Sequence, residues 1–168
     1  MSVKEFVLKK LEENRGIPLS GEAIANSLSV SRAAVWKAVR ALEAEGYHIE
    51  AVPNQGYTLC TDNDLLSTQG ILPYLNPPLK SREIRVFPCL PSTNQEAKRM
   101  ALESAEQGSA VLAEEQSAGR GRLGRSFFSP RGNGLYMSVI LRPKADVSNA
   151  VLITTAAAVG VCLSLIHI

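Results

Sequence analysis

The sequence predicts an α+β fold, in which a helical part is followed by a sheet with helices packed on it. Residues 3–13 and 21–46 place apolar side chains at helical spacing, and two short β-rich runs, 47–52 and 56–60, follow them. From residue 84 onward, strand-like and helix-like segments alternate in the order β-α-β-loop-β-α. This order predicts a mixed sheet covered by helices rather than an all-helical or an all-β protein.

The composition excludes some classes of protein. The chain has 168 residues, 45% of them hydrophobic, but no uninterrupted apolar run of about 18 residues, so we expect no membrane span. The charged N-terminal segment lacks the features of a signal peptide. Cys60, Cys89 and Cys162 have no metal-ligand spacing and favour free thiols in a reducing compartment. We therefore expect a cytoplasmic protein with no membrane partner and no metal ligands of its own.

The first part of the chain predicts three helices and a hairpin. The apolar positions of residues 3–13 give the first helix. Ser20 and Ser31 stand where the N-cap residues of a second and a third helix belong, and Gly46 ends the third. Pro53-Asn54-Gln55 joins the two β-rich runs, which is typical of a hairpin turn.

The window from Gly21 to Arg40 has the spacing of a helix-turn-helix, whose second helix enters the major groove of DNA. The following hairpin would then be the wing of a winged helix. Because the net charge of +2 indicates no partner by itself, DNA binding would depend on local cations. A plain three-helix bundle with a solvated basic face is the alternative interpretation. The side chains expected to face DNA are those of Ser31, Arg32, Ala33, Trp36, Lys37 and Arg40.

The second part of the chain predicts three strands and two helices. Ser92 or Thr93 caps the first of these helices, which we expect to run to about Gln107 and to end at Gly108. Ser148 caps the second, an apolar helix. The predicted strands are residues 84–90, 110–115 and 135–141.

These patterns predict two domains and a connection. Residues 1–62 form the winged helix-turn-helix DNA-binding domain, residues 63–82 a linker with a short helix near 67–75, and residues 83–168 the beginning of an α+β domain. The chain ends inside an apolar helix with no closing cap, so we expect it to be truncated. Its terminal CLSLIHI, residues 162–168, is interpreted as read-through at a clipped sequence end.

The stretch AGRGRLGRSFFSPRGNG, residues 118–134, holds four arginines, five glycines and no acidic residue. Nucleic-acid tails of the Arg/Gly type are long and disordered, whereas this stretch is short and lies between two apolar strands. A P-loop needs Gly-Lys-Ser/Thr at the start of a helix, and no such lysine is present. The remaining interpretations are an ordered loop that grips a compact anion, such as a phosphate or an adenylate, and a solvated cationic hairpin.

The order of several motifs resembles the biotin protein ligase family. The motifs are STNQEA at 92–97, EEQSA at 114–118, GRGRLGR at 119–125 and SPRGNGLYMS at 129–138. A winged helix in front of them is similar to the bifunctional members, which also repress the biotin operon. The resemblance covers essentially the whole chain. It implies that residues 83–168 are the N-terminal part of a class II synthetase-like ligase domain with a mixed sheet and helices, incomplete in this chain.

The resemblance also implies roles for residues of the second part. Short polar side chains would satisfy the ureido group of biotin, and arginines would screen the repulsion between the biotin carboxylate and a phosphate of ATP. The implied biotin-contacting residues are Ser92, Thr93, Asn94, Gln116, Arg120, Gly121 and Arg122, and the implied adenylate loop adds Gly119, Gly124, Arg125 and Phe127.

The implied reaction joins biotin and ATP to biotinyl-5′-AMP, with Mg²⁺ sharing the phosphate chemistry, and then transfers the acyl group to a lysine of an acetyl-CoA carboxylase carrier domain. The adenylate would also promote homodimerisation and binding to operator DNA. The family's essential lysine, in a Lys-Trp-Pro-Asn-Asp-type motif, has no counterpart here, so we assign no catalytic residue and expect it beyond the end of this chain.

Two positions depart from the family's pattern. Leu123 is apolar where many relatives carry a polar or basic residue, and Phe127 replaces a usual tryptophan but keeps an aromatic ring. Two alternatives remain open. One is a non-enzymatic winged-helix transcriptional regulator with a biotin- or adenylate-sensing domain, and the other is a truncated product that folds poorly.

Overall fold

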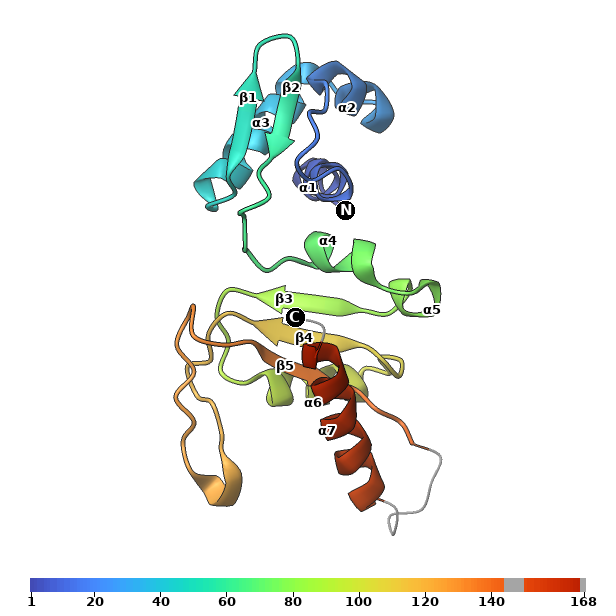
Figure 1. Ribbon diagram of the computed structural model, residues 1–168, viewed down its shortest axis with the longest axis vertical. Coiled ribbons are helices and arrows are strands. Elements are labelled where there is room, and N and C mark those ends of the chain that lie inside the picture. The colour runs from blue at the N-terminus through green and yellow to red at the C-terminus, as the bar shows by residue number, and fades with distance from the viewer. Residues whose placement is uncertain (144–149, 167–168) are drawn as a thin grey trace.

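The computed structural model describes residues 1–143 and 150–166. Figure 1 shows the helical part and its hairpin at one end of the molecule and a three-stranded sheet at the other, with α4 between them. Each part has its own hydrophobic core. The α+β architecture predicted from the order of elements is confirmed.

Three helices and a two-stranded hairpin form the first part. Two of the predicted caps are present, because the Ser20 hydroxyl accepts from Ala23 N at 3.5 Å and the Ser31 hydroxyl accepts from Ala34 N at 3.2 Å. Ser29 turns the chain between the second and third helices with a left-handed φ of 53°. The elements are α1 (Val3–Glu13), α2 (Gly21–Leu28), α3 (Arg32–Ala44), β1 (Ile49–Val52) and β2 (Gly56–Leu59).

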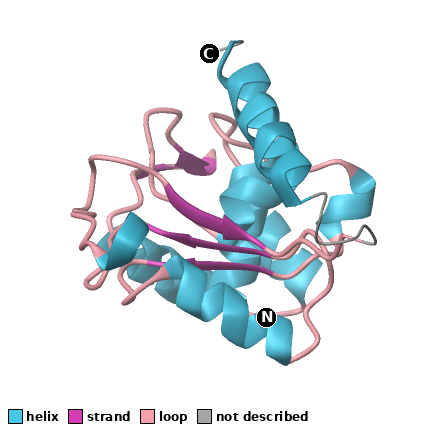
Figure 2. Ribbon diagram, turned by 90° about the horizontal axis from the view of Figure 1, so that it is seen from below, coloured by secondary structure: helices cyan, strands magenta, loops and turns pink. Residues whose placement is uncertain are grey.

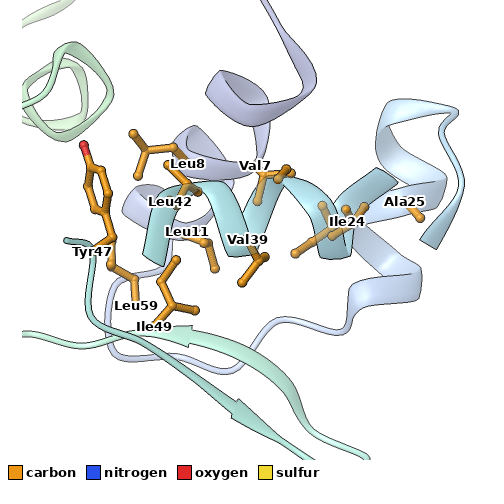
Figure 3. Packing of buried hydrophobic residues seen from close by; sticks show 12 residues of the cluster. Val7, Leu8, Leu11, Ile24, Ala25, Val39, Leu42, Tyr47, Ile49 and Leu59 are labelled. Atoms are coloured by element: carbon orange, nitrogen blue, oxygen red, sulfur yellow. The ribbon is translucent and has the colours of Figure 1, made fainter. Parts of the chain in front are cut away.

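The core of this part lies between the three helices and the hairpin (Figure 3). Ile49 pairs with Leu59 across the antiparallel hairpin, and both side chains are buried in this core. Alternation along a strand therefore turns the neighbouring positions 48, 50 and 60 to the opposite, solvent-facing side. The other buried apolar side chains include Val7, Leu11, Ile24, Ala25, Val35, Val39 and Leu42.

Short helices connect the two parts: α4 (Thr68–Ile71), η1 (Leu72–Tyr74) and α5 (Pro77–Lys80). The short helix expected near residues 67–75 is therefore present, capped by the Ser67 hydroxyl, which accepts from Gly70 N at 2.9 Å. Helix α4 contacts both α1 and the first strand of the sheet, and Thr68 Oγ1 donates to Ile84 O at 3.1 Å. The connection is thus folded against both parts.

The second part contains a mixed sheet of β3 (Ile84–Phe87), β4 (Ala110–Ala113) and β5 (Tyr136–Val139). β3 runs parallel to the central strand β4, and β5 runs antiparallel to it, as the predicted mixed sheet requires. Helix α6 (Thr93–Leu102) packs on one face of the sheet, where Met100 and Val111 are fully buried.

The last helix, α7 (Ala150–Ile166), stands apart from the sheet in Figure 2, and most of its described side chains are exposed. Ser148, its expected cap, lies outside the described residues. Among the helices that the structure describes, none is both long and apolar enough to cross a membrane.

Helix α6 is shorter than the sequence pattern predicts, since it ends at Leu102 and not near Gln107. Ser104 adopts a left-handed φ of 69°, which turns the chain out of the helix. Arg142, far along the sequence, donates from its guanidinium to Ala101 O at 2.8 Å and to Ala105 O at 3.0 Å. Carbonyls at the end of a helix need hydrogen-bond donors. The local sequence of α6 does not show that Arg142 is the donor.

Candidate functional site

A small polar pocket of about 230 Å³ lies at the N-terminus of α6. Three segments that are distant in the sequence form it: the first turn of α6, the residue Gln116 after β4, and the strand β5. We call it the α6 pocket. Its lining residues are Ser92, Thr93, Asn94, Gln116, Arg120, Leu135, Tyr136, Met137 and Ser138.

A hydrogen-bond network fixes the polar wall of the α6 pocket. Gln116 Oε1 accepts from Thr93 N at 2.9 Å and from Thr93 Oγ1 at 3.2 Å, while Gln116 Nε2 donates to Ser129 Oγ at 3.1 Å. The Gln116 side chain therefore joins the first turn of α6 to the strand that returns from the Arg/Gly stretch. Both Ser92 and Thr93 are buried, and Ser92 does not cap α6 with its hydroxyl.

Ser138 completes the network, although the sequence did not mark it as a site residue. Its hydroxyl lies 2.9 Å from Thr93 Oγ1 and donates to Asn94 Oδ1 at 2.8 Å. The side chain is buried at the face of β5 that contacts α6. A buried polar residue at an inward position of a short strand is the signal that could have revealed it.

The Arg/Gly stretch forms a hairpin, which we call the Arg/Gly hairpin, residues 116–129. Gln116 pairs with Ser129 at its base, Phe127 N donates to Gly119 O at 2.8 Å, and Gly121 N donates to Arg125 O at 2.7 Å. A short 3₁₀ turn, η2 (Arg122–Gly124), closes the tip. In Figure 1 this light-orange segment extends away from the sheet.

The α6 pocket brings together five of the residues implied by the family resemblance. These are Ser92, Thr93, Asn94, Gln116 and Arg120. The others lie farther along the hairpin and do not line the pocket. They are Gly119, Gly121, Arg122, Gly124, Arg125 and Phe127, of which Arg122, Gly124, Arg125 and Phe127 are exposed.

The glycines of the hairpin do not all have the same structural role. A Cβ on Gly119 would lie 2.4 Å from Phe127 O and 2.6 Å from Ser129 Oγ, so Gly119 lets the two hairpin strands approach each other. Gly124 has a left-handed φ of 74°, and Leu123 beside it adopts φ 58° although it carries a side chain. A Cβ on Gly121 would meet nothing closer than 3.4 Å, so no protein atom demands glycine there.

The α6 pocket is electropositive. Its lining contains Arg120 and the N-terminus of α6, and none of the lining residues is acidic. Glu96, one turn into the helix, is engaged elsewhere: hydrogen bonds from Arg99, opposed by burial, and from Arg85 lower the pKa of this carboxyl. Arg131 does not line the pocket and pairs with Glu114 at 2.9 Å. Arg120 is therefore the arginine placed to meet an anion in the pocket.

A second candidate surface lies on α3. All six side chains expected to face DNA, those of Ser31, Arg32, Ala33, Trp36, Lys37 and Arg40, are exposed. The Arg40 guanidinium lies 5.6 Å from the centre of the Trp36 ring and donates to Glu43 Oε2 at 2.9 Å. The indole, 51% exposed, thus forms a cation–π pair on the open face of the helix.

Two family models match separate parts of the chain. Residues 3–58 match the HTH domain, and residues 86–166 match the Biotin/lipoate A/B protein ligase family. A biotin protein ligase from Leishmania major, solved in complex with biotinyl-5-AMP, is similar at 38% identity with a TM-score of 0.31, covering 38% of this chain and 23% of that one.

Curated relatives combine the same two regions. The bifunctional ligase/repressor BirA of Bacillus subtilis is 38% identical over 143 residues, which cover 85% of this chain and 44% of the relative. BirA of Escherichia coli is 38% identical over 123 residues, covering 73% of this chain and 37% of the relative. The chain thus spans less than half the length of these relatives. Residues 86–166 thus match the Biotin/lipoate A/B protein ligase family, and residues 3–58 in front of them match the HTH domain.

Proposed function

We propose that this chain is the N-terminal portion of a biotin protein ligase that also represses transcription of the biotin operon. The observation that carries the proposal is the α6 pocket, in which hydroxyl and amide groups face one cavity beside Arg120. We propose the same division as for the sequence: residues 1–62 bind DNA, residues 63–82 connect, and residues 83–168 begin the ligase domain. The protein acts in the cytoplasm.

The chemistry of the α6 pocket suits biotin. The ureido group of biotin offers one carbonyl acceptor and two N–H donors, and the hydroxyl oxygens of Ser92, Thr93 and Ser138 can accept from those N–H groups. The Asn94 amide adds an N–H donor for the ureido carbonyl, because its Oδ1 already accepts from Ser138. Gln116 has a positioning role, because its carbonyl oxygen is already shared by Thr93 N and Thr93 Oγ1.

Arg120 and the arginines at the tip of the hairpin serve the adenylation step. A carboxylate oxygen of biotin attacks the α-phosphorus of ATP, the bond to the bridging oxygen breaks, and pyrophosphate leaves. Both reactants are anionic, so guanidinium groups lower the repulsion and stabilise charge in the transition state. Arg120 lines the pocket, whereas Arg122 and Arg125 would have to reach the nucleotide by movement of the hairpin tip.

In the second step, the amine of a lysine on the carrier domain of acetyl-CoA carboxylase attacks the acyl carbon, and AMP leaves.

Mg²⁺ remains a prediction that the α6 pocket does not support by itself. Mg²⁺ prefers carboxylate oxygens, and none of the residues that line the pocket in the described part of the chain supplies one. We therefore route no step through the metal.

Operator DNA is the partner proposed for α3. Arg32 and Lys37 stand exposed in the first half of the helix, and Ser31 caps its N-terminus. Helix N-termini and cationic side chains together suit a phosphate backbone and the floor of a major groove. Homodimerisation induced by the adenylate, as in the bifunctional members that the sequence resembles, would bring two such helices to one operator.

Transfer of biotin to a carrier domain distinguishes a ligase from a biotin sensor that has no enzymatic activity. The full-length protein that contains this chain is incubated with ATP, labelled biotin and the carrier domain. We expect biotin on the carrier lysine and AMP in solution only when ATP is present. A protein that binds biotin but forms no AMP would be a sensor, and the ligase assignment would be wrong.

A further inference from the structure

Four side chains with metal-binding atoms gather on the solvent-facing side of the wing, away from the α6 pocket. One ligand atom each from His48, Glu50 and Cys60 lies within 4.8 Å of the other two. Asp62 lies beside them, with its Oδ1 at 3.3 Å from His48 Nδ1. The proposed function uses none of these four residues.

The hairpin backbone holds this group together. Cys60 N donates to His48 O at 3.0 Å, so the two residues stand opposite each other across the strands. Glu50 lies two residues after His48 and therefore points to the same side of β1. Ile49 and Leu59, between them on the other side, are buried in the core and fix this register.

We propose that His48, Glu50 and Cys60 bind one Zn²⁺ at the base of the wing, with Asp62 holding the His48 ring in place. Zn²⁺ accepts imidazole nitrogen, thiolate sulfur and carboxylate oxygen together, which this set supplies. Ligand atoms in a tetrahedral zinc site stand about 3.5 Å apart, so small side-chain rotations complete the site from the observed separation. A water molecule takes the fourth position.

The surroundings of Cys60 favour a cation. The Glu50 carboxylate lies within 4.8 Å of the Cys60 sulfur, so a negative charge stands beside the thiol. On binding, the metal replaces the thiol proton, which is released to solvent. A carboxylate paired with a ligating histidine orients the ring and strengthens metal binding, and the His48–Asp62 pair matches that arrangement.

The spacing of the three cysteines could not reveal this site, because only one of its three ligands is a cysteine. The ligands also come from both sides of the turn. His48 and Glu50 precede the turn, while Cys60 and Asp62 follow it. Zinc would join the two ends of the wing at its base. It would therefore stabilise the hairpin without covering the turn at residues 53–55 or the exposed face of α3.

Metal titration of the chain tests this proposal. The protein, kept reduced, competes for Zn²⁺ with a chromophoric chelator, and Co²⁺ serves as a second probe whose absorption reports a thiolate ligand. We expect one metal per chain, a Co²⁺–thiolate band, and an unfolding midpoint that rises with Zn²⁺. Asp62→Asn should weaken Zn²⁺ binding by about tenfold, as for other second-sphere partners of a ligating histidine.

The variants separate this site from non-specific binding. Cys60→Ser and His48→Gln should each lower Zn²⁺ affinity at least as much as Asp62→Asn and should abolish the rise of the unfolding midpoint. Cys89→Ser, a change at an exposed cysteine in the second part, is the matched control and should bind Zn²⁺ normally. Equal Zn²⁺ affinity of the wild type and Cys60→Ser, or no competition with the chelator, would overturn the proposal.

Discussion

The hydroxyl oxygens of Ser138 and Thr93 lie 2.9 Å apart and join β5 to the first turn of α6. Through Gln116, which accepts from Thr93, the same network reaches the base of the Arg/Gly hairpin. Three segments that are far apart in the sequence are thus held in one arrangement around the α6 pocket. Its geometry therefore depends on polar contacts as well as on the hydrophobic core beneath it.

Ser138→Ala tests the part that β5 contributes. The change removes a buried hydroxyl that contacts Thr93 and Asn94, so we expect a loss of about 1 kcal/mol in the free energy of unfolding. Biotin affinity should also fall, and the fall should exceed what a smaller fraction of folded protein would cause. Urea unfolding and calorimetric titration of biotin measure the two effects. Ser81→Ala, at an exposed site away from the pocket, is the control, and equal biotin affinity in both variants would contradict the assignment.

Arg120→Ala tests which arginine meets the anion. Loss of a charge-assisted hydrogen bond costs about 1.5–3 kcal/mol, so retention of biotinyl-5′-AMP by the full-length protein should weaken by about tenfold or more. Because Arg120 is exposed, the unfolding free energy should change little. Arg131 does not line the α6 pocket and pairs with Glu114, so Arg131→Ala should retain the adenylate normally. Equal losses of adenylate retention and stability in Arg120→Ala would favour a purely structural loop.

Gly119→Ala and Gly121→Ala form a matched pair. The first places a Cβ 2.4 Å from Phe127 O and should open the hairpin, which hydrogen exchange of the Phe127 amide would report. The second meets nothing closer than 3.4 Å and should leave that amide protected. If ligand approaches the backbone at Gly121, this variant should lose adenylate affinity while keeping its fold. Unchanged exchange in Gly119→Ala would show that the hairpin is not closed in solution.

Replacement of Arg32 and Lys37 by alanine tests the surface on α3. Each lost phosphate contact should reduce the slope of log affinity against log salt by about one, and operator affinity should fall accordingly. Fluorescence anisotropy with operator DNA at several salt concentrations measures both quantities. Lys10→Ala removes a comparable charge from α1 and serves as the control. A salt slope that is the same in the double variant and the wild type would mean that these side chains do not meet phosphates.

Local signals in the sequence were sufficient for most of the fold. Ser20 and Ser31 cap the helices where their hydroxyls were expected to, and the two β-rich runs joined by Pro53-Asn54-Gln55 form the observed hairpin. The predicted end of α6 was wrong, because Ser104 turns the chain out of the helix and Arg142, a distant residue, donates to Ala101 O in the last turn. Propensity alone could not place that contact.

The site was only partly accessible from sequence. Thr93, Gln116 and Arg120 were named from motifs, but their convergence depends on the pairing of β3, β4 and β5. Ser138 ends the motif SPRGNGLYMS, but it was given no role of its own, because its contacts with Thr93 and Asn94 depend on the fold. Gly119 was named as part of the implied adenylate loop, and the structure adds that the hairpin itself requires a glycine at this position.

Calorimetric titration of biotin into the full-length protein carrying Thr93→Val tests the central claim most directly. Valine keeps the shape of threonine but removes the hydroxyl that joins Gln116 to Ser138 in the wall of the α6 pocket. The account predicts biotin affinity lower by about tenfold or more, as expected for a buried hydrogen bond lost from a polar site. Thr61→Val, at an exposed position, should bind biotin as the wild type does. Wild-type biotin affinity in Thr93→Val would show that biotin does not bind in this pocket.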